Sequence, residues 1–431
     1  MLDKNPGTAM PDKNPAQPAK RTLLKTALAA GATGVAAAAG GFVWGEKQGE
    51  AKTQTAQKQH SALSYPCYGT HQAGITTPHQ QFAIVAAFDV AVGTAKALEQ
   101  LLRILTSRIE FLTQGGELND GDAKLPPAGS GILGKTVPPD GLTITIGTGA
   151  SLFNERFGLA AKKPVHLQEM QKFPNDRLQA EWCDGDLSLQ ICAFSPETCQ
   201  NALRDIIKNT AQMLTTRWSI EGFLPKTEPG TAARNLFGFR DGSANPDVAN
   251  PATANQVLWT GVAANSLNEP AWAKNGSYQA VRLIRHFVEF WDRTPLQEQE
   301  TIFGREKYSG APLGMKNEHD APDYSGREGK TIPADSHMRL ANPRSPEFLK
   351  RHQLFRRPFN YSRGLAKNGQ LDVGLVFVCY QANLEDGFIF VQKLLDFEPL
   401  EEYISPFGGG YFFVLPGVEK GGFFGQSLLA D

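Results

Sequence analysis

The stretch LQICAFSPETCQNALRDII (189–207) runs from an apparent strand into an apparent helix. Apolar side chains alternate up to Phe194, Ser195 and Pro196 are typical of a helix start, and apolar residues then recur at helical spacing. The same order returns in LVFVCYQANLEDGFIFVQKLL (375–395). The repeat is one of pattern rather than of residues. It predicts two α+β domains of similar plan, each an antiparallel sheet with helices on one face.

Segments around both copies fit this plan. FAIVAAFDV (82–90) is almost wholly apolar and predicts a buried strand, and apolar residues at helical spacing predict a helix across 98–112. In the second half we expect a strand or strand pair in 276–291. A capping box at 294–297 predicts the start of a helix, and GGGYFFVLPG (408–417) predicts the closing strand.

The length of 431 residues allows two or three domains. We expect an N-terminal domain over 67–228 and a C-terminal domain over 229–431. Residues 51–66 are polar and without periodicity, which predicts a linker in front of the first domain.

The first 50 residues differ from the rest in composition. A polar, Pro-rich start precedes KRTLLK (20–25) and an uncharged run rich in Ala and Gly (26–45), the order found in export signals. The glycines and the low Leu, Ile and Val content count against the alternative, a membrane anchor. KR-x-LLK resembles the twin-arginine consensus, with Lys20 where the first Arg is usual. The sequence therefore predicts an exported, periplasmic protein that keeps no stable membrane span after export.

Charge and cysteine usage narrow the class of protein. The chain has 43 basic and 44 acidic residues, a formal net charge of −1, so no basic surface for nucleic acid is indicated. Because their number is odd, the five cysteines cannot all form disulfides within the chain. None of them has a Cys/His spacing that suits zinc. We interpret them as small buried hydrophobic side chains.

Three segments contain candidate catalytic residues: LFGFRDGSANP (236–246), DSHMRLANPR (335–344) and LFRRPFNYS (354–362). In the first, Asp241 precedes a glycine, and Asp-Gly is ordinarily a turn. In the second, His337 is a loop histidine near arginines, which is more often a solvated surface residue than a functional one. The arginine pair of the third is, on residue chemistry alone, more typical of surface charge.

In this order, the three segments resemble the dye-decolourising (DyP-type) peroxidases, a haem family with two ferredoxin-like domains that form a fold like a dimeric α+β barrel. The first segment carries the GxxDG motif at 238–242, the second matches the proximal iron-ligand histidine at His337, and the third matches the distal arginine at Arg356. YGTHQAGI, VEFWDRTPL, QLDVGLVFVCYQ and other stretches extend the resemblance over about 67–428. They are most similar to the exported branch, the deferrochelatase/peroxidase of the ferrous-iron uptake system.

The resemblance implies one haem b per chain, with His337 as the proximal axial ligand of its iron. Asp241 would move a proton of the peroxide, and Arg356 would favour its ionised form, contact the haem and stabilise negative charge on the departing oxygen. Arg344 is the expected partner of a haem propionate. The other implied haem contacts are Gly242, Ser243, Ala244, Asn342 and Pro343.

We therefore expect a haem b peroxidase that reduces hydrogen peroxide and oxidises bulky organic donors. A second implied activity is release of iron from haem with the protoporphyrin left intact, and the alternative from another class is a haem carrier without turnover. Expected partners are hydrogen peroxide, an organic reducing substrate or haem, proteins of the iron-uptake system, and a second copy of the chain in a homodimer. One departure from the family is Pro358-Phe359 in place of the usual Gly-Tyr, which stiffens the chain behind Arg356.

Overall fold

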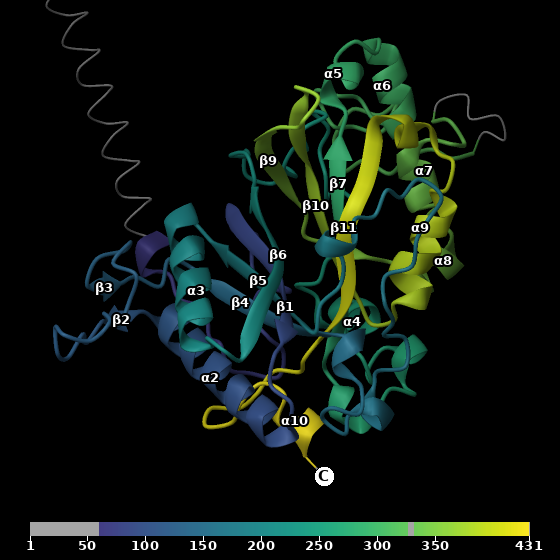
Figure 1. Cartoon of the computed structure of the whole chain (residues 1–431). Helices are drawn as coiled ribbons and strands as arrows, with labels where there is room; N and C mark the ends of the chain where they lie inside the picture. The colour runs from purple at the N-terminus through teal and green to yellow at the C-terminus, as the bar shows by residue number, and fades with distance from the viewer. Residues whose placement is uncertain (1–59, 326–331, 431) are drawn as a thin grey trace, which may run out of the picture. The chain divides into compact units, whose positions relative to one another are not determined.

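The computed structural model describes residues 60–325 and 332–430 (Figure 1). Its eight long strands form two groups of four, with the antiparallel orders β4-β5-β1-β6 and β11-β7-β10-β9. Both orders are those of a ferredoxin-like βαββαβ unit. The strands are β1 (Phe82–Val90), β4 (Thr143–Gly149), β5 (Leu187–Ala193), β6 (Leu214–Phe223), β7 (Ser277–His286), β9 (Phe359–Leu365), β10 (Leu371–Gln381) and β11 (Ile404–Val414).

The two groups join edge to edge into a closed ring. β4 pairs with β11 through Gly147–Gly149, and β6 meets β9 where Phe223 lies opposite Asn360. Because β7 pairs with both β10 and β11, each of these eight strands has a neighbour on either side. The ring is narrowly closed at one of these joints, because β6 and β9 meet at a single residue pair and the rest of β6 pairs with β1 alone. The α+β fold class predicted from the sequence is confirmed.

Strand β1 is buried on both of its faces, which explains its almost wholly apolar sequence. Ala83 and Val85 belong to a core shared with strands of the second group, such as Val376 of β10. Ile84 and Phe88 instead belong to the core beneath α2 and α3. Alternate residues of one strand therefore hold the ring and the helix layer together.

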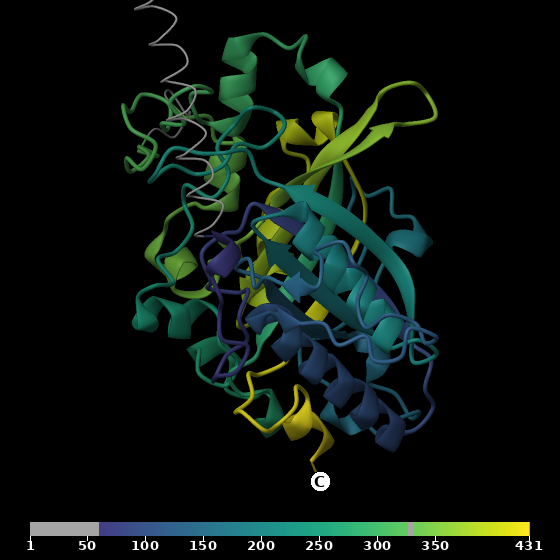
Figure 2. The ribbon, with the colours of Figure 1, turned by 90° about the vertical axis from the view of Figure 1, so that its left-hand side faces the viewer.

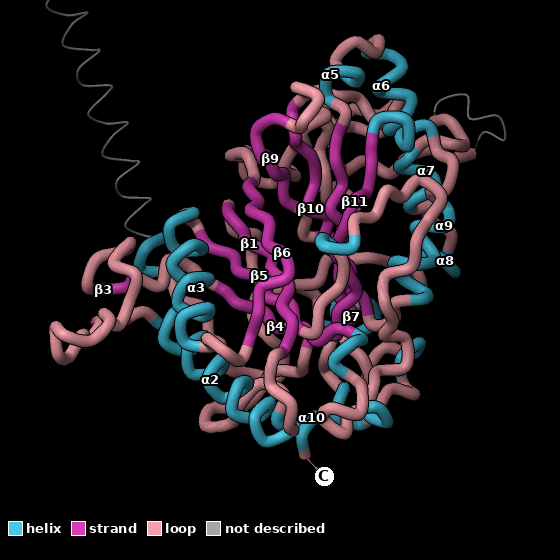
Figure 3. Tube along the Cα trace, in the orientation of Figure 1, coloured by secondary structure: helices cyan, strands magenta, loops and turns pink. Residues whose placement is uncertain are grey.

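Helices α2 (Ala95–Gln114) and α3 (Pro196–Asn209) lie side by side across one face of the first group (Figures 2 and 3). The helix predicted from the apolar spacing in 98–112 is confirmed, and those apolar side chains are buried. The side chain of Thr94 caps α2 by accepting a hydrogen bond from the backbone nitrogen of Ala97.

The second group is accompanied by shorter helices, and α7, α8 and α9 lie together along one side of it (Figure 1). A π-helical turn, η6 (Glu385–Ile389), runs directly into α9 and packs against β10. The remaining α-helices and short strands are α4 (Pro251–Val257), α5 (Val288–Trp291), α6 (Leu296–Phe303), α7 (His337–Ala341), α8 (Pro346–Arg351), α9 (Phe390–Leu394), α10 (Gln426–Leu429), β2 (Gly116–Glu117), β3 (Thr136–Val137) and β8 (Phe355–Arg356). Short 3-10 helices are η1 (Ala150–Leu152), η2 (Ala160–Lys162), η3 (Ala180–Trp182), η4 (Ala264–Ser266), η5 (Ala271–Ala273) and η7 (Pro399–Tyr403).

Some local predictions were wrong. The expected strand over 276–291 ends at His286, and its last residues form helix α5 instead. The expected capping box is absent, because α6 begins after Pro295, which has extended backbone angles and occupies the N-cap position. The hydroxyl of Thr294 therefore does not cap α6 and donates to the hydroxyl of Tyr403 at 3.1 Å.

The predicted export signal (1–50) lies outside the described residues, as does most of the predicted linker. The linker's end, 60–66, packs on the body through two backbone bonds, from Asp140 to Ser61 and from Gly141 to Leu63. Within the part of the chain that the structure describes, no helix has both the length and the apolarity needed to cross a bilayer. The five cysteines are all free and buried, as predicted.

Candidate functional site

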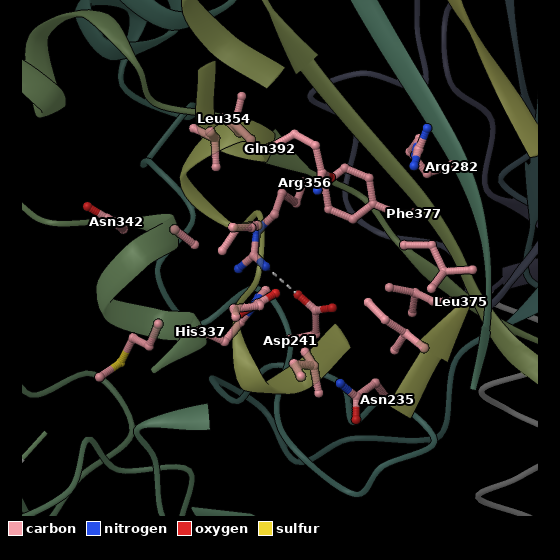
Figure 4. A pocket seen from close by; sticks show the side chains of 18 of the residues that line it. Asn235, Asp241, Arg282, His337, Asn342, Leu354, Arg356, Leu375, Phe377 and Gln392 are labelled. Atoms are coloured by element: carbon pink, nitrogen blue, oxygen red, sulfur yellow. Dashed lines mark hydrogen bonds and ion pairs between the residues drawn. The ribbon is translucent and has the colours of Figure 1, made fainter. Parts of the chain in front are cut away.

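A large cavity opens beside the second group of strands (Figure 4). Its walls come from β7, β10 and the start of β11, from α7, η6, α9 and η7, and from the loop over 235–246. The segment 173–176 of the N-terminal half closes one side. The empty space between these walls, including the part that is open to solvent, is about 1620 Å³.

His337 reaches this cavity from the first position of α7. Its Nδ1 lies 2.9 and 2.8 Å from the two carboxylate oxygens of Glu398, which is buried at the start of η7. The accessible part of the His337 side chain, 27%, lies in the cavity that the residue lines. Because Glu398 occupies Nδ1, Nε2 is the nitrogen left to bind a ligand.

Opposing effects act on the protonation of His337. Burial lowers its pKa, but the charge of Glu398 and the hydrogen bond to it outweigh burial, so the pKa is raised overall. The charges of Arg356 and Asp241 act on the same ring in opposite directions. A buried carboxylate that accepts the Nδ1 proton fixes both the tautomer and the ring orientation, an arrangement typical of metal-binding histidines.

Asp241 and Arg356 form an ion pair in the same cavity. The Oδ1 atom of Asp241 lies 2.8 Å from Nη1 of Arg356, drawn as the dashed contact in Figure 4. The angles of this contact are not those of a hydrogen bond, and Oδ1 is buried without a hydrogen-bond donor. The Asp-Gly turn is present as well, because Gly242 has a positive φ of 106° and its oxygen accepts from the nitrogen of Asn245. Asp241 therefore both begins a turn and lines the cavity.

The structure brings together most, but not all, of the predicted site residues. Gly242, Pro343 and Arg344 do not line the cavity. Gly242 has no side chain to present, and the chain leaves the cavity wall after Asn342, where α7 has ended, to reach α8. The predicted residues that line it are Asp241, Ser243, Ala244, His337, Asn342 and Arg356.

Arg305 is a cavity-lining cation that the sequence did not reveal. It is buried, and its Nη1 donates to the backbone oxygens of Gly310 (2.6 Å) and Glu318 (3.0 Å). Its pKa is lowered by burial and then by the charges of Arg356 and Arg344. A buried cation bonded to main-chain oxygens is well placed to receive an anionic group of a ligand. Nothing around Arg305 in the sequence separates it from a surface arginine.

The two arginines of the RR pair have different environments. Arg356 lines the cavity, whereas Arg357 is almost fully buried and binds the side-chain oxygen of Gln80 (2.8 Å) and the backbone oxygen of Thr77. The expectation of two surface charges, drawn from residue chemistry alone, was wrong. Successive side chains of an extended chain point to opposite sides, so Arg356 at the end of β8 and Arg357 directly after it point in different directions.

Comparison with known proteins decides the family. The family model "Dyp-type peroxidase, N-terminal" matches residues 72–224, and "Dyp-type peroxidase, C-terminal" matches 232–419. This chain belongs to the Dyp-type peroxidase family. The family and the peroxidase enzyme class predicted from the sequence are thereby confirmed.

Relatives of this Dyp-type peroxidase cover nearly the whole chain. The deferrochelatase of Escherichia coli K12 is 51% identical over 424 residues, 96% of this chain and 97% of the relative. The deferrochelatase of Yersinia pestis is 52% identical over 370 residues, 84% of each chain. Among solved structures, the DyP-type peroxidase of Cellulomonas bogoriensis is 33% identical with a TM-score of 0.77, over 86% of this chain and 99% of that one. Ferric DtpA of Streptomyces lividans is 32% identical with a TM-score of 0.76, over 86% and 98%.

Proposed function

We propose that this chain is a haem b peroxidase that reduces hydrogen peroxide and oxidises bulky organic donors, and that it also releases iron from haem with the protoporphyrin left intact. The observation that carries the proposal is that a carboxylate-oriented histidine and an Asp–Arg ion pair line one large cavity. The ferric and oxyferrous forms of Streptomyces lividans DtpA support an iron cofactor. The name deferrochelatase, borne by the Escherichia coli relative, supports the second activity.

The residues around the cavity fit a haem. Apolar side chains such as Leu375, Phe377 and Phe388 offer surface for a macrocycle. The buried Oδ1 atom of Asn342 lacks a hydrogen-bond partner on the protein, which is expected where a ligand supplies one. A cavity that is mostly apolar with a few placed polar groups is the usual form of a cofactor site.

Three residues would hold this group. His337 would bind the iron through Nε2 as its one protein ligand. Arg305 lines the cavity and would pair with a propionate. Arg344 lies outside the lining but has a buried Nε without a hydrogen-bond partner, and it would pair with the other propionate. When bound, the haem would supply the redox-active iron that reacts with peroxide.

The chain's own residues would move the proton and stabilise the charge. Asp241 accepts the proton that peroxide loses at one oxygen and returns it to the oxygen that departs. Arg356, 2.8 Å from Asp241, favours the ionised carboxylate and donates to the negative charge that develops on the departing oxygen. Glu398 increases the electron donation of His337 by accepting its Nδ1 proton.

Release of iron makes a different demand on the same site. His337 must let the iron go, and the porphyrin nitrogens must take up protons in its place. A haem carrier would more often bind the iron through a second side chain. The other histidines that line the cavity do not fit this role, because they are packed on aromatic rings. His286 lies on Phe237 at 4.0 Å and His352 on Phe390 at 3.8 Å, measured between ring centroids. Burial also lowers the pKa of His286 to about 3.

We further propose export to the periplasm by a twin-arginine-type signal within residues 1–50, a homodimer, and association with the iron-uptake system. The support for export is the basic and weakly apolar order of the first residues. The support for the dimer and for the iron-uptake partners is the family resemblance.

The test of the proposed function is a spectrum followed by analysis of the pigment. Haem-loaded protein is mixed with hydrogen peroxide and a bulky dye, and the absorption of haem and dye is recorded. We expect the haem bands to change on mixing and the dye to be bleached with turnover. Pigment extracted after reductive incubation should contain iron-free protoporphyrin. Unchanged bands and an intact dye would favour the carrier.

A second expected result concerns Glu398. The change Glu398→Gln keeps a hydrogen-bond acceptor for His337 but removes the charge, so the histidine should hold iron less firmly. We expect haem to transfer to an excess of a haem-accepting apoprotein about 10 to 100 times faster than from the parent. The control is Glu401→Gln, a second carboxylate that lines the cavity, and it should leave the transfer rate near the parent value. Equal rates in all three proteins would remove Glu398 from the support of His337.

A further inference from the structure

We propose that Asn245 is a positioning residue that holds Arg356 in register with Asp241. The inference rests on the proposed function, because it assigns Asn245 a role through Arg356. Asn245 lies at the end of the segment that carries Asp241, four positions after it.

The side-chain amide of Asn245 binds both backbone groups of Arg356. Its Nδ2 donates to the oxygen of Arg356 at 2.8 Å, and the nitrogen of Arg356 donates to its Oδ1 at 3.1 Å. This two-way contact has the form of the pairing between neighbouring strands. The amide thus takes the place of a strand beside residue 356.

The geometry of β8 explains why Arg356 needs such a partner. On its other side β8 pairs with β10, where Arg356 lies opposite Cys379 and the nitrogen of Arg357 donates to the oxygen of Val378 at 2.8 Å. In an antiparallel pair, backbone groups of successive residues point alternately toward and away from the partner strand. The backbone groups of Arg356 therefore face away from β10, and Asn245 satisfies both of them.

Backbone hydrogen bonds of the same loop also fix the position of Asp241. The backbone nitrogen of Asp241 donates to the oxygen of Ala233 at 2.8 Å, and the backbone nitrogen of Asn245 donates to the oxygen of Gly242 at 2.9 Å. Asn245, whose side chain binds the backbone of Arg356, therefore also closes the turn after Asp241. Arg357 anchors β8 to Gln80 in the N-terminal half, whereas Asn245 ties β8 to the Asp241 loop. The 2.8 Å separation between the Asp241 and Arg356 side chains thus depends on Asn245.

A double-mutant cycle separates positioning from a general structural effect. Haem-loaded parent, Asn245→Ala, Arg356→Leu and the double variant are compared by the rate of the reaction with peroxide and by the dissociation constant for fluoride, an anion that binds over the iron. We expect Asn245→Ala to slow the peroxide reaction roughly tenfold to a hundredfold and to weaken fluoride binding in the same direction as Arg356→Leu. If Asn245 acts through Arg356, the double variant should be no worse than Arg356→Leu alone. Pigment per chain should stay near the parent value.

The matched control is Asn250→Ala, an asparagine a few residues further along whose side chain caps α4 by accepting from Ala252 at 2.9 Å. It should lower thermal stability yet leave the peroxide rate and fluoride binding unchanged. If Asn245→Ala does not fold, Asn245→Asp keeps the acceptor for Arg356 and loses the donor, and an intermediate loss is expected.

The outcomes distinguish the two proposals. A large effect of Arg356→Leu with parent-like behaviour of Asn245→Ala and Asn245→Asp overturns the inference alone. Additive losses in the double variant overturn it too, because Asn245 would then act independently of Arg356. A neutral Arg356→Leu overturns the proposed role of Arg356 itself.

Discussion

Replacement of His337 by alanine should leave the purified protein with on the order of a tenth, or less, of the haem that the parent retains. The reason is that His337 is the proposed sole protein ligand of the iron, and its partner Glu398 would be left buried without its hydrogen-bond donor. The other histidines that line the cavity, His286 and His352, are stacked on aromatic rings and cannot take over the role without leaving them. The measurement is pigment absorbance per chain after reconstitution with excess haem and removal of the unbound part.

The control for this change is His352→Ala, which removes a cavity-lining imidazole whose Nδ1 faces the backbone oxygen of Asp386 at 2.6 Å. It should keep nearly full pigment. Added imidazole should restore haem to His337→Ala, because the space left by the side chain lies beside Glu398. A His337→Ala protein with parent-like pigment and an unchanged five-coordinate spectrum would show that another residue binds the iron.

The fold could be predicted in outline because its strongest signals are local. Strand β1 was predicted from an almost wholly apolar run and helix α2 from apolar residues at helical spacing, and both are present. The closure of the ring could not be predicted, since it depends on contacts such as Phe223 with Asn360 between distant segments. The capping box failed because a proline, Pro295, moved the helix start by one position relative to the pattern.

The same contrast holds for the site. Asp241, His337 and Arg356 were found because each lies in a short recognisable motif, and the structure places all three on one cavity. Glu398 was missed because it is 61 residues from the histidine that it orients. Arg305 was missed because burial, and not its neighbours in sequence, distinguishes it from an exposed arginine.

The change Asp241→Asn tests the proton-transfer role with the least disturbance of shape. Asparagine has nearly the size of aspartate but cannot accept and return a proton, so the reaction with peroxide should slow by roughly 10² to 10⁴. Haem content should remain near the parent value, because Asp241 is proposed to act on peroxide and not to bind the iron. The measurement is the rate of the change in the haem bands after rapid mixing with hydrogen peroxide, together with pigment per chain.

The matched control is Asp247→Asn, an exposed carboxylate directly after the same segment whose side chain accepts from the backbone nitrogen of Ala249 at 3.1 Å. It should react with peroxide at the parent rate, because it lies outside the cavity lining. If Asp241→Asn reacts slowly with peroxide and Asp247→Asn reacts at the parent rate, the proton transfer depends on the carboxylate in the cavity and not on the charge of the loop. If Asp241→Asn reacts with peroxide as fast as the parent, Asp241 has no part in the proton transfer and serves only in the turn that the sequence suggested. The ion pair with Arg356 would then serve only to position the arginine.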